Sequence, residues 1–457
     1  MLKKYLELRE KYPRFCFDSY EYTINGDTVS AKYNFSIDGL ARFSPQWTFV
    51  KKCETAENDS VLEKLIFSLG LVELISYWKI TCSPQVKINC GFLEQEQINW
   101  WKKQYFYGLG EFFHTNDIQP DFDSFMQIEV NETRKIEEKP KTHCNLAGCL
   151  VPVGGGKDSA VTLEILKNIE NINYNDDVAC YVINPRGATD ETARAAGIKD
   201  ENVIIAKRTL DKNMLDLNRQ GFLNGHTPFS AIVAFSSVIT AYLCGKKYVV
   251  LSNEASANES TVADSKINHQ YSKSFDFEKD FHDYEKEYIG SGVYYFSLLR
   301  PLSEFQIAKY FAQHKQYHGV FKSCNAGSKQ NVWCANCPKC LFVYIILSPF
   351  LSSDELTAIF GENLFEKASL EETFDKLAGI LPEKPFECVG SRDEVNESLN
   401  ITVKNLKLQG KEPAYLLKRF KDGGYAKEPT GEYDRYYNSE NLLPEKFQKA
   451  LKKSVML

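Results

Sequence analysis

The sequence predicts an α/β protein whose parallel sheet is covered by helices on both faces. From Leu150 onward, short apolar stretches typical of strands alternate with longer stretches of helical periodicity. Three consecutive glycines separate the first of these strands from the first helix, and a charged segment at 131–142 separates this part of the chain from a region with hairpin periodicity. Alternating strands and helices are typical of a parallel sheet, and we expect a smaller α+β domain before the charged segment.

The N-terminal region predicts a hairpin followed by helices. Residues 18–37 alternate apolar and polar side chains around an Asn-Gly dipeptide, which favours a tight hairpin turn. Apolar residues recur every three to four positions over 60–79 and predict a helix, and the aromatic segment 100–113 predicts core packing. The charged run 131–142 has the composition of a linker, so we place the first domain at 1–142.

The second domain, at 143–350, follows the alternation of strands and helices. In chain order we expect a strand at 150–153, a helix from residue 159, strands at 177–183 and 203–205, a helix at 232–243 and a strand at 248–252. After residue 352 the pattern is mainly helical, and we assign 351–457 to a third, mostly helical region.

The composition is that of a globular protein from a reducing compartment. Its 457 residues include 55 Lys and Arg against 61 Asp and Glu, and the net charge of −6 disfavours a broad nucleic-acid surface. The longest apolar run, 341–351, is interrupted by Ser348 and Pro349 and is too short to cross a bilayer, so we expect no membrane partner. Thirteen cysteines without regular spacing outside one cluster suit a reducing compartment, and we predict a cytoplasmic protein.

The segment 151–159 predicts a phosphate-binding turn. Its glycines let the backbone turn tightly with its N–H groups inward, and the helix that follows directs its positive end at an anion. Asp158 is placed to orient magnesium, and Ser159 adds a hydroxyl donor. The predicted nucleotide-binding residues of this segment are Gly154, Gly155, Gly156, Lys157, Asp158 and Ser159.

The spacing of this turn differs from both the P-loop and the dinucleotide-binding pattern. It resembles the Ser-Gly-Gly-x-Asp-Ser loop of the PP-loop ATP pyrophosphatases, with Gly154 where that family has Ser. The resemblance implies a PP-loop sheet, similar to the adenine nucleotide alpha hydrolases, and an enzyme that cleaves ATP to AMP and pyrophosphate. A plain loop between strand and helix is the alternative interpretation.

One group of cysteines has the spacing of metal ligands. It follows the pattern C-x9-C-x2-C-x2-C and consists of Cys324, Cys334, Cys337 and Cys340. Short gaps allow the thiolates to converge on one ion, so the pattern predicts a closed, tetrahedral and therefore structural zinc site. The same cluster stands beside the PP-loop of the similar queuosine-pathway nitrile synthase. An iron–sulfur cluster and buried cysteines without a metal are the alternatives.

Three polar segments between the turn and the cysteines carry further candidate site residues. The first, 224–230, contains His226, but helix capping by Thr227 and Pro228 could explain this segment alone. The second, 252–259, follows a strand and so lies where parallel sheets bind ligands or magnesium. The third, 268–274, is dense in hydrogen-bond donors. The candidates from these last two segments are Asn253, Glu254, Glu259, His269 and Lys273. Arg300, further along the chain, is another candidate, which could contact phosphate or pair with Glu304.

The order of these motifs resembles the UDP-N-acetylmuramoyl-L-alanyl-L-glutamate epimerase family, MurL. The resemblance covers about residues 100–395 and includes the segment Phe386–Gly390, which contains Cys388. It implies an enzyme of peptidoglycan precursor synthesis that uses ATP and a divalent ion such as Mg²⁺. That enzyme inverts the terminal L-glutamate of a UDP-linked muramoyl dipeptide. We carry over no catalytic residue from the resemblance.

Adenylation explains why an ATP-cleaving enzyme would epimerise an amino acid. A free carboxylate resists loss of its α-proton because the carbanion would lie beside an existing negative charge. An acyl-adenylate is neutral there and delocalises the new charge into its carbonyl group. A base on one face and an acid on the other would complete the inversion. The candidates for these two roles are His226, His269, Lys273, Glu254, Glu259 and Cys388.

Three other functions fit the same residues. In an ATP-dependent ligase, or an amide or nitrile synthase, an amine would attack the same adenylate. An RNA-modifying enzyme would use Cys334 and Cys337 as sulfur carriers, a role that four metal-bound thiolates exclude. A nucleotide-binding regulator with a zinc clip would release no pyrophosphate in response to a precursor peptide.

Overall fold

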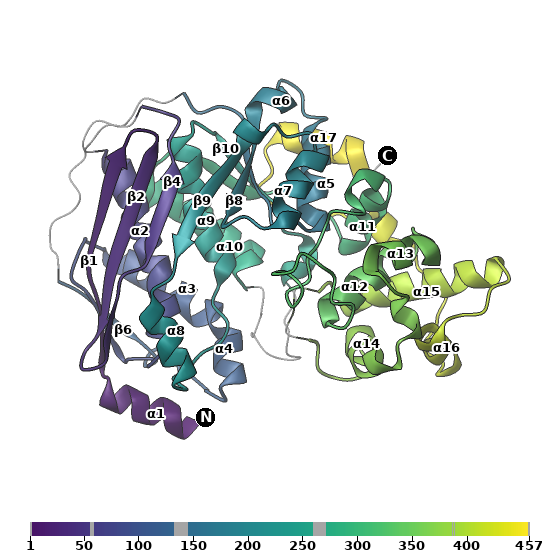
Figure 1. The fold of residues 1–457 in the computed structure, drawn as a ribbon, viewed down its shortest axis with the longest axis horizontal. Helices are drawn as coiled ribbons and strands as arrows, with labels where there is room; N and C mark the ends of the chain where they lie inside the picture. Colours follow the sequence, from purple (N-terminus) through teal and green to yellow (C-terminus); the bar gives the residue numbers. More distant parts are fainter. Residues whose placement is uncertain are drawn as a thin grey trace. The chain divides into compact units, whose positions relative to one another are not determined.

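The computed structural model of the chain describes residues 2–54, 59–131, 145–258, 271–385, 387 and 389–455 (Figure 1). The chain divides into two compact units, each built from three discontinuous segments. The first unit contains Met1–Leu150, Ile204–Val249 and Gln270–Tyr295, and the second contains Val151–Val203, Val250–His269 and Phe296–Leu457. The predicted division into 1–142, 143–350 and 351–457 concerns domains that fold on their own, and it stays a prediction.

The first unit contains a large mixed sheet. Its strands are β1 (Arg14–Asn25), β2 (Thr28–Ile37), β3 (Ala41–Phe43), β4 (Gln46–Val50), β5 (Gln85–Ile88), β6 (Gln127–Val130) and β9 (Val203–Thr209). They lie in the order β9-β4-β2-β1-β5-β6, with β3 beside β2. Neighbours are antiparallel from β9 to β1 and parallel from β1 to β6. β1 and β2, purple in Figure 1, confirm the predicted hairpin, and Gly26 makes its turn with φ +56°.

An apolar helix forms the core of this unit. α2 (Ser60–Trp78) is buried on nearly all sides, as expected for a helix that is hydrophobic all round, and it confirms the predicted helix. The helix begins at Asp59, whose carboxylate accepts two main-chain N–H groups of the first turn. A Cβ on Gly70 would lie 2.5 Å from the ring of Phe17 and 2.8 Å from that of Tyr33. Glycine at this position therefore lets the helix approach the hairpin closely.

Further helices of the first unit pack aromatic side chains. They are α1 (Leu2–Lys11), α3 (Gln95–Gly108), α4 (Gly110–Thr115), α8 (Lys212–Arg219), α9 (Phe229–Leu243), α10 (Phe275–Tyr284) and the π-helical turn η4 (Glu285–Ile289). Trp101 of α3 stacks on Phe235 of α9 with 5.1 Å between ring centroids, as the expected core packing requires. α9 confirms the helix predicted at 232–243. The expected capping was wrong by one residue, because Pro228 is the N-cap and the Thr227 hydroxyl instead accepts a hydrogen bond from Lys79 at 2.6 Å.

The strands and helices predicted after residue 150 are present, but β9 and α9 belong to the first unit, where β9 pairs antiparallel with β4, so the predicted parallel sheet is instead mixed. The other predicted strands reach into the second unit. Strands β7 (Cys149–Pro152), β8 (Val178–Ile183), β10 (Tyr248–Leu251) and β11 (Tyr294–Ser297) lie in the order β11-β10-β7-β8, and β7 and β10 are parallel. The division between the two units passes through β7, β10 and β11. Helices α5 (Lys157–Leu166), α6 (Tyr174–Asp177) and α7 (Gly187–Ala195) follow β7 and β8 along the chain. The chain is therefore α/β, as predicted, whereas the PP-loop assignment stays a prediction.

The C-terminal part of the second unit is helical, as predicted for 351–457. Its helices are α11 (Glu304–Ala312), α12 (Pro338–Leu347), α13 (Ser353–Phe360), α14 (Glu371–Ala378), α15 (Arg392–Leu408), α16 (Tyr415–Asp422) and α17 (Glu445–Val455). The largely buried α12 packs against α11, α14 and α15. Short 3₁₀ helices of the second unit are η1 (Asp200–Asn202), η2 (Ala255–Asn258), η5 (Lys315–Tyr317), η6 (Leu364–Glu366), η7 (Ala368–Leu370) and η8 (Glu432–Arg435), and η3 (Tyr271–Lys273) belongs to the first unit. Within the described part of the chain, no helix combines the length and the apolar character needed to cross a membrane.

Candidate functional site

The phosphate turn, which we define as Gly154–Gly156, joins β7 to α5. Gly155 has φ +85°, and a Cβ on it would lie 2.7 Å from the Cβ of Ala188 and 3.0 Å from its carbonyl oxygen, so glycine is required. A Cβ on Gly154 would meet no atom within 4 Å. Gly156 is the N-cap of α5 and brings no side chain to cap the first N–H groups. The start of α5 is therefore suited to an anion, as the sequence predicts.

Lys157 and Ser159, on either side of Asp158 at the start of α5, both have partners within the protein. The Ser159 hydroxyl donates to the carbonyl oxygen of Gly156 at 3.0 Å, inside the first turn of α5. The Lys157 side chain is only 4% exposed, and its ammonium forms ion pairs with Asp158 at 2.5 Å and with Glu304. Both residues therefore stabilise the start of α5 and the acidic side chains next to it.

Three carboxylates from separate parts of the second unit converge beside the turn. Asp158 comes from the first turn of α5, Glu254 from the loop after β10, and Glu304 from the first turn of α11. One oxygen of each lies within 4.8 Å of the other two. We call these three residues the carboxylate cluster. Because β7 and β10 are parallel neighbours, their carboxyl ends lie at the same edge of the sheet, which brings the turn and the 252–254 loop together.

The charges of this cluster are unbalanced. Burial alone lowers the pKa of Lys157, but the carboxylates of Asp158 and Glu304 outweigh burial and raise that pKa above its usual value. Burial raises the pKa of Glu304 to about 8; Lys157 opposes the rise, and the charges of Asp158 and Glu254 add to it. Among the described residues, the cluster sets three carboxylates beside the Lys157 ammonium and the Arg300 guanidinium, which contacts the Glu254 backbone. A divalent cation with oxygen ligands suits such a site.

Several buried groups hold the cluster in place. Arg300 is fully buried, and its Nη1 donates to the main-chain oxygen of Glu254 at 2.7 Å. The main-chain N–H of Glu304 donates to Glu394 at 2.6 Å, and Glu394 also forms a capping box with Ser391 at the start of α15. Burial raises the pKa of the Glu394 carboxyl. The sequence prediction missed Glu394, although a Ser-x-x-Glu capping pattern just after Gly390 signals that a helix begins there.

The predicted residue Asn253 lies beside the cluster. It precedes Glu254 directly in the chain, and its side-chain amide donates to the Ser297 hydroxyl at 3.0 Å. This contact connects the ends of β10 and β11. Glu304, which the sequence offered as a partner for Arg300, forms its ion pair with Lys157.

His226 belongs to the first unit, where it has a carboxylate partner. Its Nδ1 lies 3.0 Å from an Oε2 of Glu111, and the two side chains are 21% and 15% exposed. Lys79 holds the same segment, since its ammonium donates to the Gly225 carbonyl and, at 2.6 Å, to the Thr227 hydroxyl. Burial lowers the pKa of Lys79 to about 8, and the nearby Arg208 charge acts in the same direction. Sequence reasoning missed Lys79 and Glu111, yet a lysine at the end of an apolar helix is a visible signal.

The remaining candidates are only partly described. Lys273 ends the short helix η3 and is half-buried. The other three predicted site residues, Glu259, His269 and Cys388, lie outside the described residues.

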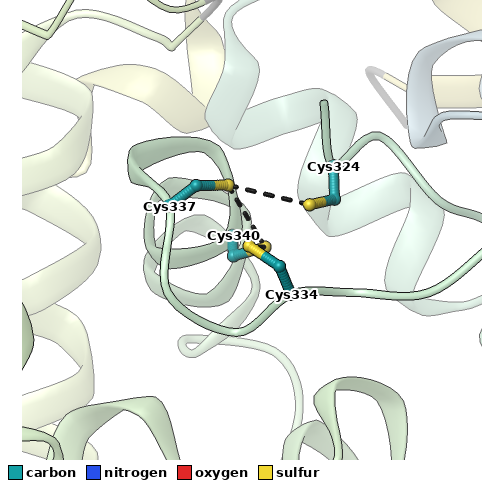
Figure 2. Close-up of side chains that lie close together, drawn as sticks. All are labelled: Cys324, Cys334, Cys337 and Cys340. Carbon is teal, nitrogen blue, oxygen red and sulfur yellow. Dashed lines mark hydrogen bonds between the residues drawn. The ribbon is translucent and has the colours of Figure 1, made fainter. Parts of the chain in front are cut away.

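The four predicted metal-binding cysteines do converge. Figure 2 shows their sulfur atoms directed toward one another, and all four lie within 4.8 Å. The Sγ–Sγ distances are 3.8 Å for Cys324 and Cys337, 3.7 Å for Cys334 and Cys340, and 3.4 Å for Cys337 and Cys340. A tetrahedral zinc with Zn–S bonds of about 2.3 Å requires about 3.8 Å between sulfurs, so the donor set fits a zinc ion. Cys337 is the N-cap of α12, which anchors one side of the group on a buried helix.

Comparisons with known proteins identify the family of this chain. A family model described as the MurL N-terminal domain matches residues 7–298, and one described as the MurL C-terminal domain matches 320–421. The chain belongs to the MurL family. This confirms the resemblance seen in the sequence.

Three relatives with the same name have the same level of similarity. Each is named UDP-N-acetyl-alpha-D-muramoyl-L-alanyl-L-glutamate epimerase and is 32% identical to this chain. The protein of Xanthomonas oryzae pv. oryzae aligns over 79% of this chain and 79% of its own length, that of Salinispora tropica over 84% and 83%, and that of a Micromonospora species over 84% and 85%. No solved structure matches.

Proposed function

We propose that this protein inverts the terminal L-glutamate of UDP-N-acetylmuramoyl-L-alanyl-L-glutamate, a precursor of peptidoglycan. The observation that carries the proposal is membership of the MurL family together with the name of the three relatives, each aligned over most of its length. We propose further that the reaction consumes ATP by adenylating the glutamate carboxylate. Adenylation removes the negative charge next to the α-carbon and so makes the α-proton acidic enough for a side chain to remove. After the α-carbon is reprotonated on the other face, water would hydrolyse the acyl-adenylate to the free carboxylate and AMP.

The phosphate turn and the carboxylate cluster support the use of ATP. The turn offers main-chain N–H groups at the start of α5 to phosphate oxygens. Asp158, Glu254 and Glu304 would hold Mg²⁺, and a bound magnesium ion supplies charge stabilisation to the departing pyrophosphate. Lys157 keeps Asp158 and Glu304 close together, and Arg300 fixes the backbone at Glu254. We therefore assign Glu254 to the cation and no longer to proton transfer.

His226 and Lys79 are the described side chains best suited to proton transfer. The Glu111 carboxylate lies 3.0 Å from Nδ1 of His226 and would orient the imidazole for proton transfer. Lys79 holds the segment that carries His226, and burial lowers its pKa to about 8, within reach of neutral pH. Lys273, Glu259, His269 and Cys388 stay candidates on sequence grounds. We expect the protein to act as a cytoplasmic enzyme, without nucleic acid or membrane as a partner.

The products of ATP cleavage test the proposal of adenylation. We expect AMP and pyrophosphate, formed only when the UDP-linked dipeptide is present, and both can be followed by ³¹P NMR. Asp158→Asn should slow their formation by about a hundredfold or more with little change in Tm, because the carboxylate acts on the ion and Glu304 still pairs with Lys157. The control Asp176→Asn changes an exposed ion pair with Lys199 and should keep full activity. ADP and orthophosphate as products would contradict adenylation, and an amide formed from ammonia would instead establish a ligase.

A further inference from the structure

The cysteine loop, residues 322–337, touches the phosphate turn directly. The main-chain N–H of Lys322 donates to the carbonyl oxygen of Gly155 at 2.7 Å. The next residue, Ser323, packs on the turn, since a Cβ on Gly156 would lie 3.3 Å from the Ser323 Cβ. The residue after that is Cys324, one of the four converging thiols. One ligand is thus two residues from a hydrogen bond that holds the turn.

A second contact reaches the turn through α7. A Cβ on Gly187, the first residue of α7, would lie 2.5 Å from the side-chain nitrogen of Asn331, which belongs to the cysteine loop. That nitrogen also lies 3.4 Å from the carboxylate of Glu191 in the same helix. Ala188 lies between Gly187 and Glu191 in α7, and its carbonyl oxygen would be 3.0 Å from a Cβ on Gly155. The cysteine loop therefore contacts the phosphate turn directly, and it also contacts α7, which packs against the turn.

The cysteine loop is irregular, so individual contacts hold its shape, among them the hydrogen bond from Lys367 to the Ala335 carbonyl at 2.9 Å. Between Cys324 and Cys334 it has no helix or strand, and Val332 is 47% exposed. Trp333 packs on Phe360 with 4.7 Å between ring centroids and is the loop's large buried side chain. Asn331 and Ala335 both adopt positive φ, +55° and +53°, which costs free energy for residues other than glycine. The Gly327 N–H donates to the Cys324 sulfur at 3.1 Å, so the fold of the loop is built around that atom.

We propose that the metal ion held by Cys324, Cys334, Cys337 and Cys340 positions the phosphate turn for nucleotide binding. The ion would cross-link the loop to the start of α12. The loop carries the Lys322 N–H that donates to the Gly155 carbonyl, and this hydrogen bond would keep the turn in its present conformation. Loss of the ion should therefore change the phosphate turn before it changes the rest of the second unit. This inference rests on the proposed binding of ATP.

Metal removal and amide exchange test the coupling with a readout other than activity. Purified protein is first analysed for zinc and iron, then stripped of metal with a chelator, and part of the stripped protein is reconstituted with zinc. Each form is studied by hydrogen–deuterium exchange and by calorimetric titration with ATP and Mg²⁺. We expect faster exchange at 153–157 and 322–324 in the stripped form, unchanged exchange in the β1–β2 hairpin, and ATP affinity about tenfold weaker, all restored by zinc. Cys337→Ser should behave as the stripped form, and the matched control Cys90→Ser, in the first unit, as the intact protein.

The outcomes separate this inference from the proposed function. Unchanged exchange at 153–157 after metal removal would overturn the coupling, as would faster exchange throughout the protein or fresh protein without metal. If the intact protein does not bind ATP, the proposed use of ATP fails, and the exchange at 153–157 still decides whether the metal positions the turn. Asn331→Ala, which keeps all four cysteines, should weaken ATP binding in the same direction without loss of metal.

Discussion

At the scale of single residues, the sequence indicated which side chains are polar and near a strand end but could not pair them. It pointed to Asp158 and Glu254 separately and offered Glu304 only as a partner for Arg300. In the structure Glu304 joins the two other carboxylates and pairs with Lys157, while Arg300 supports the Glu254 backbone. Such pairings depend on which strands are neighbours, and a single sequence holds no direct record of that adjacency.

Lys79 gives a prediction about pH and stability. Burial lowers the pKa of Lys79 from its ordinary 10.5 to about 8 in the folded protein. Between these two pH values the unfolded chain binds the extra proton, so the free energy of unfolding rises with pH. Below pH 8 the buried charge costs about 3 kcal/mol relative to pH 10.5. Lys79→Met should therefore flatten this rise when urea unfolding is measured from pH 7 to 10. Lys64→Met, on the same helix, is the control and should keep the wild-type slope; equal slopes for wild type and Lys79→Met would refute the assignment.

At the scale of elements, periodicity and turn chemistry were sufficient for much of the fold. The hairpin at 18–37 and the helix at 60–79 were predictable because their apolar side chains recur at the spacing of strands and of a helix, and an Asn-Gly dipeptide marks the hairpin turn. The helix α9 was predictable too, but its cap was not, because Lys79 recruits the Thr227 hydroxyl. The partners of each strand in the mixed sheet depend on contacts between distant segments, which local patterns do not encode.

The phosphate turn gives a prediction at this scale. Gly155→Ala must place a Cβ 2.7 Å from that of Ala188 on a backbone with φ +85°, so we expect a loss of stability of about 1–3 kcal/mol and loss of ATP binding. Gly154→Ala has room for its Cβ and should cost little stability, which makes it the matched control. Thermal unfolding and ATP titration of the two variants provide the measurement. Equal Tm values for them would mean that the turn relaxes around the added methyl group.

At the scale of the whole molecule, the order of motifs along the chain predicted the family correctly, whereas the complete site could not be assembled from sequence. The candidates fall in two compact units: His226 and Lys273 in the first, the phosphate turn, the carboxylate cluster and the cysteines in the second. The order of motifs identifies relatives because it can be compared directly along two chains. Its chemistry depends on side chains such as Glu111 and Glu394, which carry no motif of their own and are recognised only through their partners.

Isotope exchange during turnover tests the central claim most directly. The protein is incubated in deuterated water with ATP, Mg²⁺ and UDP-N-acetylmuramoyl-L-alanyl-L-glutamate, and the amino acids of the product are separated by chirality and analysed by mass. Inversion through a planar, adenylated intermediate predicts D-glutamate that carries deuterium at its α-carbon, together with unlabelled L-alanine, and His226→Ala should release pyrophosphate but place little deuterium there. L-Glutamate without deuterium, after ATP has been consumed, would contradict the account.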